Sequence, residues 1–136
     1  MVGGGQLARM THQAAIALGQ SLRVLAQSPD DGAALVAADV QIGEHTDLDA
    51  LREFAKSCDV VTFDHEHVPS AHIQALAAEG FSVHPGAEAL QFAQDKLLMR
   101  TRLTELGFPA PRWRTVAGLD DLVSFGDEVG WPVIAK

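Results

Sequence analysis

Two short polar segments of this 136-residue chain contain residue types that bind small ligands. The first is GGGQLARM, in which Gly3, Gly5 and Ala8 match the G-x-G-x-x-G/A pattern of dinucleotide-binding turns. Glycines let a ligand approach the backbone closely, and the free N–H groups at the start of the following helix favour anions. The segment predicts a small-molecule site. The alternative is that the glycines only permit close packing of the helix on a strand.

A dinucleotide site needs a further group, an acidic residue about 20 residues after the glycines that binds the ribose hydroxyls. Gln27 stands at that place, and the first acid after it is Asp30. An NADP site would need a basic residue there, whereas the sequence reads SPDD. These residues disfavour NAD(P) and FAD and favour another polar or phosphorylated ligand.

The second polar segment is TFDHEHVP, which follows a run of apolar residues. Strand alternation would place Asp64 and Glu66 on one side and His65 and His67 on the other. We expect Glu66 or Asp64 to contact a substrate amine or hydroxyl. Zinc binding by the two histidines is an alternative, although no third ligand is close in sequence, and a solvated loop is another.

Two lysines are candidates for phosphate contacts. Lys136 ends the apolar run PVIAK, where a buried ammonium must reach water or an anion. Lys96 lies four residues before Arg100 on one helix face, a spacing that usually marks a solvated charged face. The alternative is that Asp95 and Lys96 face a cleft.

The elements that must position these residues alternate along the chain. Apolar periodicity predicts helices at 6–18, 32–39, 45–59, from Pro69 up to Gly80, at 86–107 with a break near Gln91, and at 119–130. Apolar runs predict strands at 21–27, 40–42, 60–63, 81–85, 113–116 and 131–136. This alternation indicates an α/β fold with a Rossmann-like, doubly wound parallel sheet, and both polar segments fall at the carboxyl ends of its strands.

Some local features of these helices are also predicted. Thr46 is the expected N-cap of the helix at 45–59. Gly19, Gly80 and Gly130 are expected to end helices, each followed by a strand. The apolar stripe of the first helix consists of Leu7, Met10, Ala14 and Leu18.

Composition excludes several classes of protein. The net charge of −8 is opposite to the basic footprint of a nucleic-acid binder. No run reaches the roughly 18 apolar residues of a membrane helix, and no secretory leader pattern is present. Cys58 is the only cysteine, which excludes a disulfide framework and favours a cytoplasmic protein.

Four segments resemble the N5-carboxyaminoimidazole ribonucleotide synthetase family of the ATP-grasp superfamily: GGGQLARM, VVTFDHEHVP, AQDKLLMRTRLTELGFPAP and GWPVIAK. Ala8 stands where that family commonly has glycine, and His65 where an apolar residue is more usual. The resemblance implies a pre-ATP-grasp, Rossmann-like domain over residues 1–106 and the start of an ATP-grasp domain over 107–136. Only two residues precede Gly3, so we expect an N-terminal fragment with a truncated first strand.

The resemblance also implies an activity. The family comprises ATP-dependent carbon–nitrogen ligases of de novo purine synthesis. They use ATP, Mg²⁺ and bicarbonate to carboxylate aminoimidazole ribonucleotide through carboxyphosphate. Lys96 and Lys136 match the family's ATP contacts, and Glu66 matches a glutamate that approaches the ribonucleotide. The residues that match the loop lining that substrate's site are Gly5, Gln6 and Leu7.

Further expectations follow from the same resemblance. Catalytic residues and metal ligands would lie outside this fragment, which would be inactive alone, and the full-length enzyme would be a cytoplasmic homodimer that binds neither nucleic acid nor membrane. Three alternatives stay open. The first is another ATP-grasp enzyme, such as an ATP-grasp carboxylase or the ATP-dependent glycinamide ribonucleotide formyltransferase, whose opening loop usually reads G-x-G-E-L. The second is a stand-alone Rossmann nucleotide-binding module, and the third is a purely structural or partner-binding domain.

Overall fold

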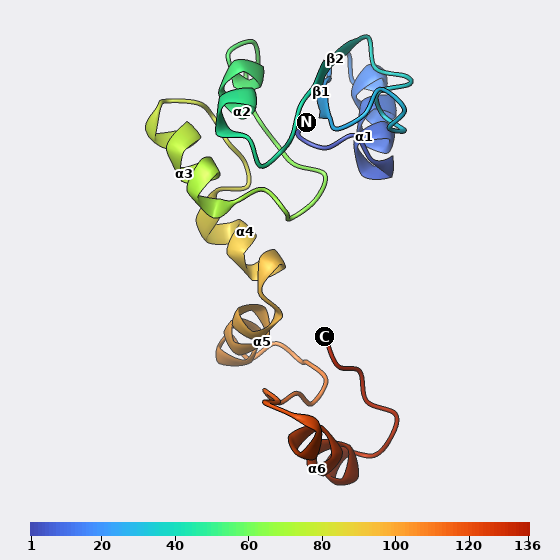
Figure 1. Cartoon of the computed structure of the whole chain (residues 1–136), viewed down its shortest axis with the longest axis vertical. Coiled ribbons are helices and arrows are strands. Elements are labelled where there is room, and N and C mark those ends of the chain that lie inside the picture. The colour runs from blue at the N-terminus through green and yellow to red at the C-terminus, as the bar shows by residue number, and fades with distance from the viewer. The chain divides into compact units, whose positions relative to one another are not determined.

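The computed structural model describes all of residues 1–136, which form two compact units, Met1–Gln91 and Phe92–Lys136 (Figure 1). The elements are α1 (Gln6–Ala17), β1 (Arg23–Ala26), β2 (Asp39–Ile42), α2 (Leu48–Ala55), α3 (Ser70–Ala78), α4 (Ala87–Gln94), α5 (Lys96–Glu105) and α6 (Leu119–Val129). The boundary between the units falls within α4. None of the helices is both long enough and apolar enough to cross a membrane.

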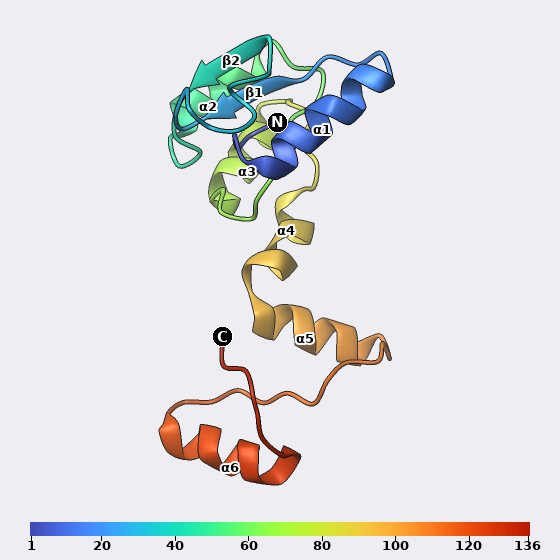
Figure 2. The same ribbon diagram turned by 90° about the vertical axis from the view of Figure 1, so that its right-hand side faces the viewer.

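A parallel sheet forms the centre of the first unit (Figure 2). β1 pairs in parallel with β2, with Arg23 opposite Asp39. Single parallel bridges continue the sheet beyond β1, and they join Val2 to Leu25, Val2 to Phe63 and Val61 to Val83. The order across the sheet is therefore β2, β1, the N-terminal segment, residues 61–63 and residue 83, which is the order of a doubly wound fold. The predicted α/β class is confirmed.

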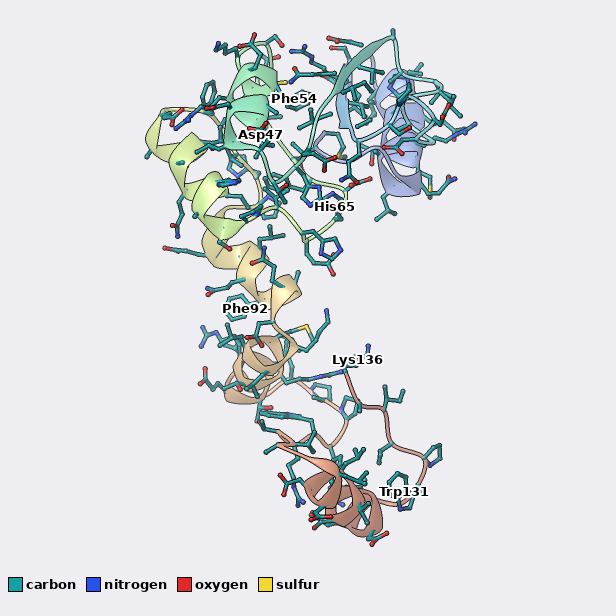
Figure 3. All side chains as sticks on the ribbon, in the orientation of Figure 1. Asp47, Phe54, His65, Phe92, Trp131 and Lys136 are labelled. Atoms are coloured by element: carbon teal, nitrogen blue, oxygen red, sulfur yellow. The ribbon has the colours of Figure 1, made fainter.

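Each face of this sheet covers a separate apolar cluster. Val24 and Ala26 of β1 pack with Ala8 of α1 on one face. Leu25 points to the other face, where Phe54 of α2 is the largest fully buried side chain. Figure 3 shows Phe54 directed from α2 toward the strands. Because successive side chains of a strand alternate, β1 contributes to both clusters.

α1 packs against the sheet through a small side chain. Ala8 is the only buried residue of the helix. The stripe recognised in the sequence stays exposed, since Leu7, Met10 and Leu18 are 60%, 63% and 76% accessible. The helix is therefore predicted correctly, but its apolar periodicity does not mark the face that contacts the sheet.

The N-cap of α2 differs from the expectation. Asp47, and not Thr46, caps the helix, because Asp47 Oδ1 accepts hydrogen bonds from the backbone N–H groups of Asp49 (2.9 Å) and Ala50 (3.2 Å). A carboxylate at this place also interacts favourably with the positive end of the helix dipole. The helix ends at Ala55, earlier than predicted.

The predicted helix at 86–107 is broken at Asp95 and not near Gln91. The Asp95 carboxylate accepts hydrogen bonds from the N–H groups of Leu97 (2.8 Å) and Leu98 (3.0 Å) and so begins a new helix, α5. A side chain that caps a helix start competes with continuation of the preceding helix.

Three further element predictions are wrong. Residues 32–39 form turns instead of a helix until β2 begins, and residues 113–116 and 131–136 are not strands. A strand needs a hydrogen-bonded neighbour, and neither segment pairs with one. The predicted helix ends are confirmed, with positive φ at Gly19 (+68°), Gly80 (+92°) and Gly130 (+92°).

In the second unit, the connection between α5 and α6 packs on α6. Arg112 and Arg114 both pair with Glu128. The Arg114 guanidinium also lies 5.2 Å from the centre of the Phe125 ring. These contacts hold an otherwise irregular segment against the helix.

Candidate functional site

A cavity of about 420 Å³ lies at the carboxyl ends of the parallel strands in the first unit. The segments that follow the N-terminal strand, β1, β2 and residues 61–63 all contribute to its wall. Its volume is within the range, about 300–1,000 Å³, that is typical of small-molecule sites. The crevice expected from the alternation of strands and helices is therefore present where the two polar segments meet.

The glycine loop is shaped by a side chain distant in sequence. Gly3 has φ of +108°, and a Cβ at this residue would lie 1.6 Å from Asp64 Oδ1. Any side chain at Gly3 would therefore be strained and would also displace Asp64. The backbone of the loop is fixed by hydrogen bonds from Gly3 N to Leu25 O and from Ala33 N to Gly4 O, both 2.9 Å.

Asp64 is a nearly buried carboxylate of the cavity wall that contacts the glycine loop. Its side chain is 5% exposed, and its Oδ2 accepts a hydrogen bond from Gly5 N at 2.9 Å. Its own N–H donates to Val2 O at 3.0 Å, so the parallel pairing of the two segments sets its position. Oδ1 is buried and has no hydrogen-bond partner.

Two histidines lie beside this carboxylate. His65 Nε2 is 3.8 Å from Asp64 Oδ1, and the His65 and His45 rings meet edge to face at 4.7 Å. Burial lowers the pKa of His65, and the nearby charge of Asp64 opposes this effect. His65 Nδ1 accepts a hydrogen bond from the His67 backbone N–H at 3.1 Å, so the neutral ring carries its proton on Nε2, facing Asp64.

The end of β1 places an amide where a dinucleotide site would need an acid. Gln27 lines the cavity at the place of the ribose-binding acid, and its amide donates to the Glu44 carboxylate. The next turn is closed by Asp31, whose Oδ2 accepts hydrogen bonds from the backbone N–H groups of Gln27 (3.1 Å) and Ser28 (3.3 Å). Asp31 also lies on the cavity wall.

The structure brings together some of the predicted site residues. Gly5, Gln6 and Leu7 line the cavity, as does Asp64, while Glu66 is half-buried and does not. Strand alternation puts Asp64 and Glu66 on one side and does not rank them. His45 approaches from the loop after β2, and no pattern in the sequence marks it.

Both candidate phosphate-binding lysines are in the second unit. Lys96 is exposed at the start of α5, and its Nζ donates to Ala93 O at 3.2 Å. Lys136 is exposed at the end of the chain, as labelled in Figure 3. Both ammonium groups are thus accessible to an anion.

The chemistry of the cavity is acidic and rich in acceptors. Its wall includes the carboxylates of Asp31 and Asp64 but no lysine or arginine. Such a wall suits a ligand part with hydrogen-bond donors, for example an amine or ribose hydroxyls. No group of three or more His, Cys, Asp or Glu side chains in the chain is arranged to hold a metal ion, so His65 and His67 are not assigned as metal ligands.

The doubly wound sheet, the glycine loop and the polar cavity define a Rossmann-like domain with a cavity at the carboxyl ends of its strands. Residues 1–94 match a family model described as the ribonucleotide synthetase preATP-grasp domain. The chain belongs to this family, and the resemblance recognised in the sequence is confirmed.

Curated relatives agree. The chain is 55% identical over all 136 residues to a protein of Mycobacterium bovis, and 60% identical over 122 residues, 90% of the chain, to one of Mycobacterium leprae. Both are named N5-carboxyaminoimidazole ribonucleotide synthase. The matches span 32% and 28% of those relatives, so the chain corresponds to about a third of their length.

Solved structures share the fold. The synthetase from Thermus thermophilus is 38% identical, with a TM-score of 0.79, and the match covers 97% of this chain and 37% of that one. The enzyme from Aspergillus clavatus, solved with ADP and 5-aminoimidazole ribonucleotide, is 30% identical, with a TM-score of 0.81 and coverage of 96% and 36%. These likenesses agree with the pre-ATP-grasp domain that the family model places over residues 1–94.

Proposed function

We propose that the protein to which this chain belongs is an ATP-dependent carbon–nitrogen ligase of purine synthesis. It carboxylates 5-aminoimidazole ribonucleotide to the N5-carboxy product with ATP and bicarbonate. The observation that carries the proposal is the glycine-loop cavity in a chain 55% identical to named synthases. The structure of the Aspergillus clavatus relative with the same ribonucleotide supports this choice of substrate.

The first unit supplies part of the ribonucleotide site in this proposal. Gly5, Gln6 and Leu7 form its wall, consistent with their place on the cavity. Glu66, which does not line the cavity, would contact a part of the substrate that extends beyond it, an amine or a ribose hydroxyl, as a hydrogen-bond acceptor. The absence of basic side chains from the wall supports binding of the donor-bearing part of the ligand here, with the phosphate held by other residues.

ATP is assigned to the second part of the chain. Lys96 and Lys136 contact its phosphates, which their exposed ammonium groups permit. A relative from Aspergillus clavatus was solved with ATP. Mg²⁺ would accompany ATP and neutralise the phosphates, with ligands outside residues 1–136. We further place the start of the ATP-grasp domain at residue 107 and propose a cytoplasmic homodimeric enzyme.

A calorimetric titration tests the substrate assignment. The chain is titrated separately with 5-aminoimidazole ribonucleotide, NAD and glycinamide ribonucleotide. Saturable binding of the first ligand, with weaker or no binding of the other two, supports the proposal. Tight binding of NAD would instead identify a dinucleotide module, and preference for glycinamide ribonucleotide would identify a formyltransferase-type enzyme.

A further inference from the structure

The carboxylate of Asp64 lies behind the glycine loop and touches it at two points. Oδ2 accepts the hydrogen bond from Gly5 N at 2.9 Å. Oδ1 fills the space that a Cβ on Gly3 would occupy. The hydrogen bond holds the Gly5 end of the three-glycine loop, and the close approach of Oδ1 leaves no room for a side chain at Gly3.

No side chain within α1 or at its N-cap accepts a hydrogen bond from the backbone at the start of the helix. Gly5 is the N-cap of the helix and provides no side-chain hydrogen bond of its own. The helix start carries a partial positive charge, which favours a carboxylate close to it. Asp64 supplies that carboxylate from 59 residues further along the chain. The sheet holds Asp64 in place, because its N–H is bonded to Val2 O.

The other carboxylate oxygen of Asp64, Oδ1, lies near His65 of the cavity wall. Oδ1 is buried without a hydrogen-bond partner, an arrangement that costs free energy and is uncommon in folded proteins. It lies 3.8 Å from His65 Nε2, the nitrogen that carries the proton of the neutral ring. An electrostatic attraction between these atoms orients the His65 ring at the edge of the cavity.

The geometry points to Asp64 as a positioning residue of the ligand cavity, which holds the Gly3–Gly5 loop through Oδ2 and orients His65 through Oδ1. The inference rests on the proposed function, because it takes the aminoimidazole ribonucleotide as the ligand. Asp64 influences the affinity for that ligand through these two neighbours.

Two substitutions distinguish the hydrogen bond from Gly5 N to Oδ2 from the contact between Oδ1 and His65. Asp64→Ala removes both. Asp64→Asn retains an oxygen that accepts the Gly5 N–H but turns an NH₂ group toward the N–H of His65, so two donors face each other. Asp59→Ala is the matched control, since Asp59 is an exposed aspartate five positions earlier in the same segment.

Affinity for 5-aminoimidazole ribonucleotide is measured by calorimetry on each folded variant. Loss of a charge-assisted hydrogen bond predicts about tenfold weaker binding or more for Asp64→Ala. For Asp64→Asn, which loses one contact, we expect about threefold weaker binding. Asp59→Ala should bind like the unmodified chain. In ¹⁵N–¹H spectra, the Gly5 amide should shift strongly in Asp64→Ala and little in Asp64→Asn.

The outcomes distinguish this inference from the proposed function. If the unmodified chain binds the ribonucleotide and both Asp64 variants bind it equally well, the positioning role is wrong. A lower melting temperature without a change in affinity would likewise assign Asp64 to stability alone. If Asp64→Ala does not fold, the Asn variant decides by the same criterion. If the unmodified chain does not bind the ribonucleotide at all, the proposed function fails, and the ligand site assigned to Asp64 fails with it.

Discussion

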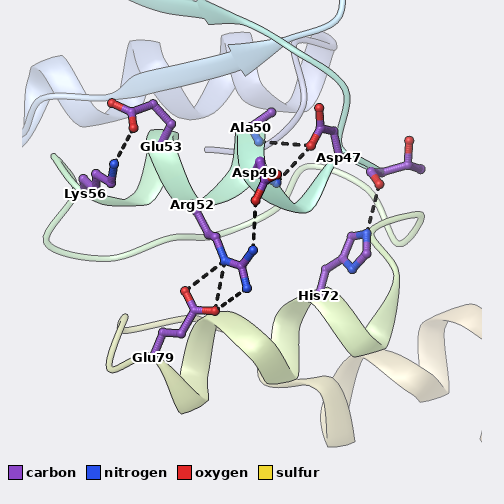
Figure 4. A network of polar contacts seen from close by, with 9 residues as sticks. Asp47, Asp49, Ala50, Arg52, Glu53, Lys56, His72 and Glu79 are labelled. Carbon is purple, nitrogen blue, oxygen red and sulfur yellow. Dashed lines mark hydrogen bonds and ion pairs between the residues drawn. The ribbon is translucent and has the colours of Figure 1, made fainter.

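Arg52 of α2 and Glu79 at the end of α3 form a bidentate ion pair (Figure 4). Arg52 Nε lies 3.0 Å and 3.1 Å from the two carboxylate oxygens, and Nη2 lies 2.6 Å from Oε1. Asp49 adds a third contact to the same guanidinium, at 2.9 Å. The pair thus ties together two helices that cover the same face of the sheet.

The first prediction concerns the pH dependence of this pair. The hydrogen bonds from Arg52 lower the pKa of Glu79. The contribution of Glu79 to stability is therefore present above the ordinary pKa of a glutamate and is lost as the pH falls through the lowered value. Glu79→Gln should reduce the melting temperature slightly at pH 7, and the difference should vanish in strong acid. A difference that persists there would contradict an electrostatic role.

The second prediction concerns the core. Phe54 is fully buried between α2 and the sheet, so Phe54→Ala should lower the free energy of unfolding by about 3–5 kcal/mol. Leu18→Ala is the control, because Leu18 is 76% exposed and its loss should change stability by less than about 0.5 kcal/mol. Urea denaturation followed by circular dichroism measures both. Equal effects would mean that the packing of α2 is wrongly described.

The third prediction distinguishes the two candidate caps of α2. Asp47→Ala removes two hydrogen bonds to the helix start and should cost about 1 kcal/mol. Thr46→Ala should have an effect within about 0.5 kcal/mol, since the exposed Thr46 side chain does not cap the helix. The same denaturation measurement applies. A larger loss of stability for Thr46→Ala than for Asp47→Ala would show that Thr46 is the N-cap after all, as the sequence predicts.

The fourth prediction concerns His65. Burial lowers its pKa, so the ring should titrate below the usual range of histidine and be neutral at pH 7. Asp64→Asn should lower this pKa further, because the Asp64 charge favours the protonated ring. Ring-proton NMR shifts followed against pH measure both values. A rise in pKa on this substitution would contradict the orientation of the two groups.

Much of the first unit could be predicted from the sequence, because its helices and strands alternate with clear periodicity. α6 and the glycines that end helices were also predicted correctly, since each has a local signal. The segments at 113–116 and 131–136 were not, because a strand depends on a neighbour that local sequence does not reveal. The periodicity of α1 also indicates the wrong contact face for a similar reason. The helix approaches the sheet at the small residue Ala8, while its larger apolar side chains stay exposed.

The candidate site was predictable in its parts but not in its contacts. The glycine pattern identified the loop, and the polar segment after residue 63 identified a carboxylate. The hydrogen bond from Gly5 to Asp64 joins residues 59 positions apart and follows from the parallel pairing of Val2 with Phe63. Sequence alternation alone could not favour Asp64 over Glu66, since the chain leaves the strand at this point.

The most direct test of the central claim is a ¹⁵N–¹H NMR titration of the chain with 5-aminoimidazole ribonucleotide. We expect the largest shift changes at Gly3, Gly4, Gly5, Gln6 and His65, which line the cavity. An equal concentration of NAD should leave these resonances nearly unchanged. Shift changes confined to residues outside the cavity, or equal changes with NAD, would contradict the assignment of the glycine loop to a ribonucleotide substrate.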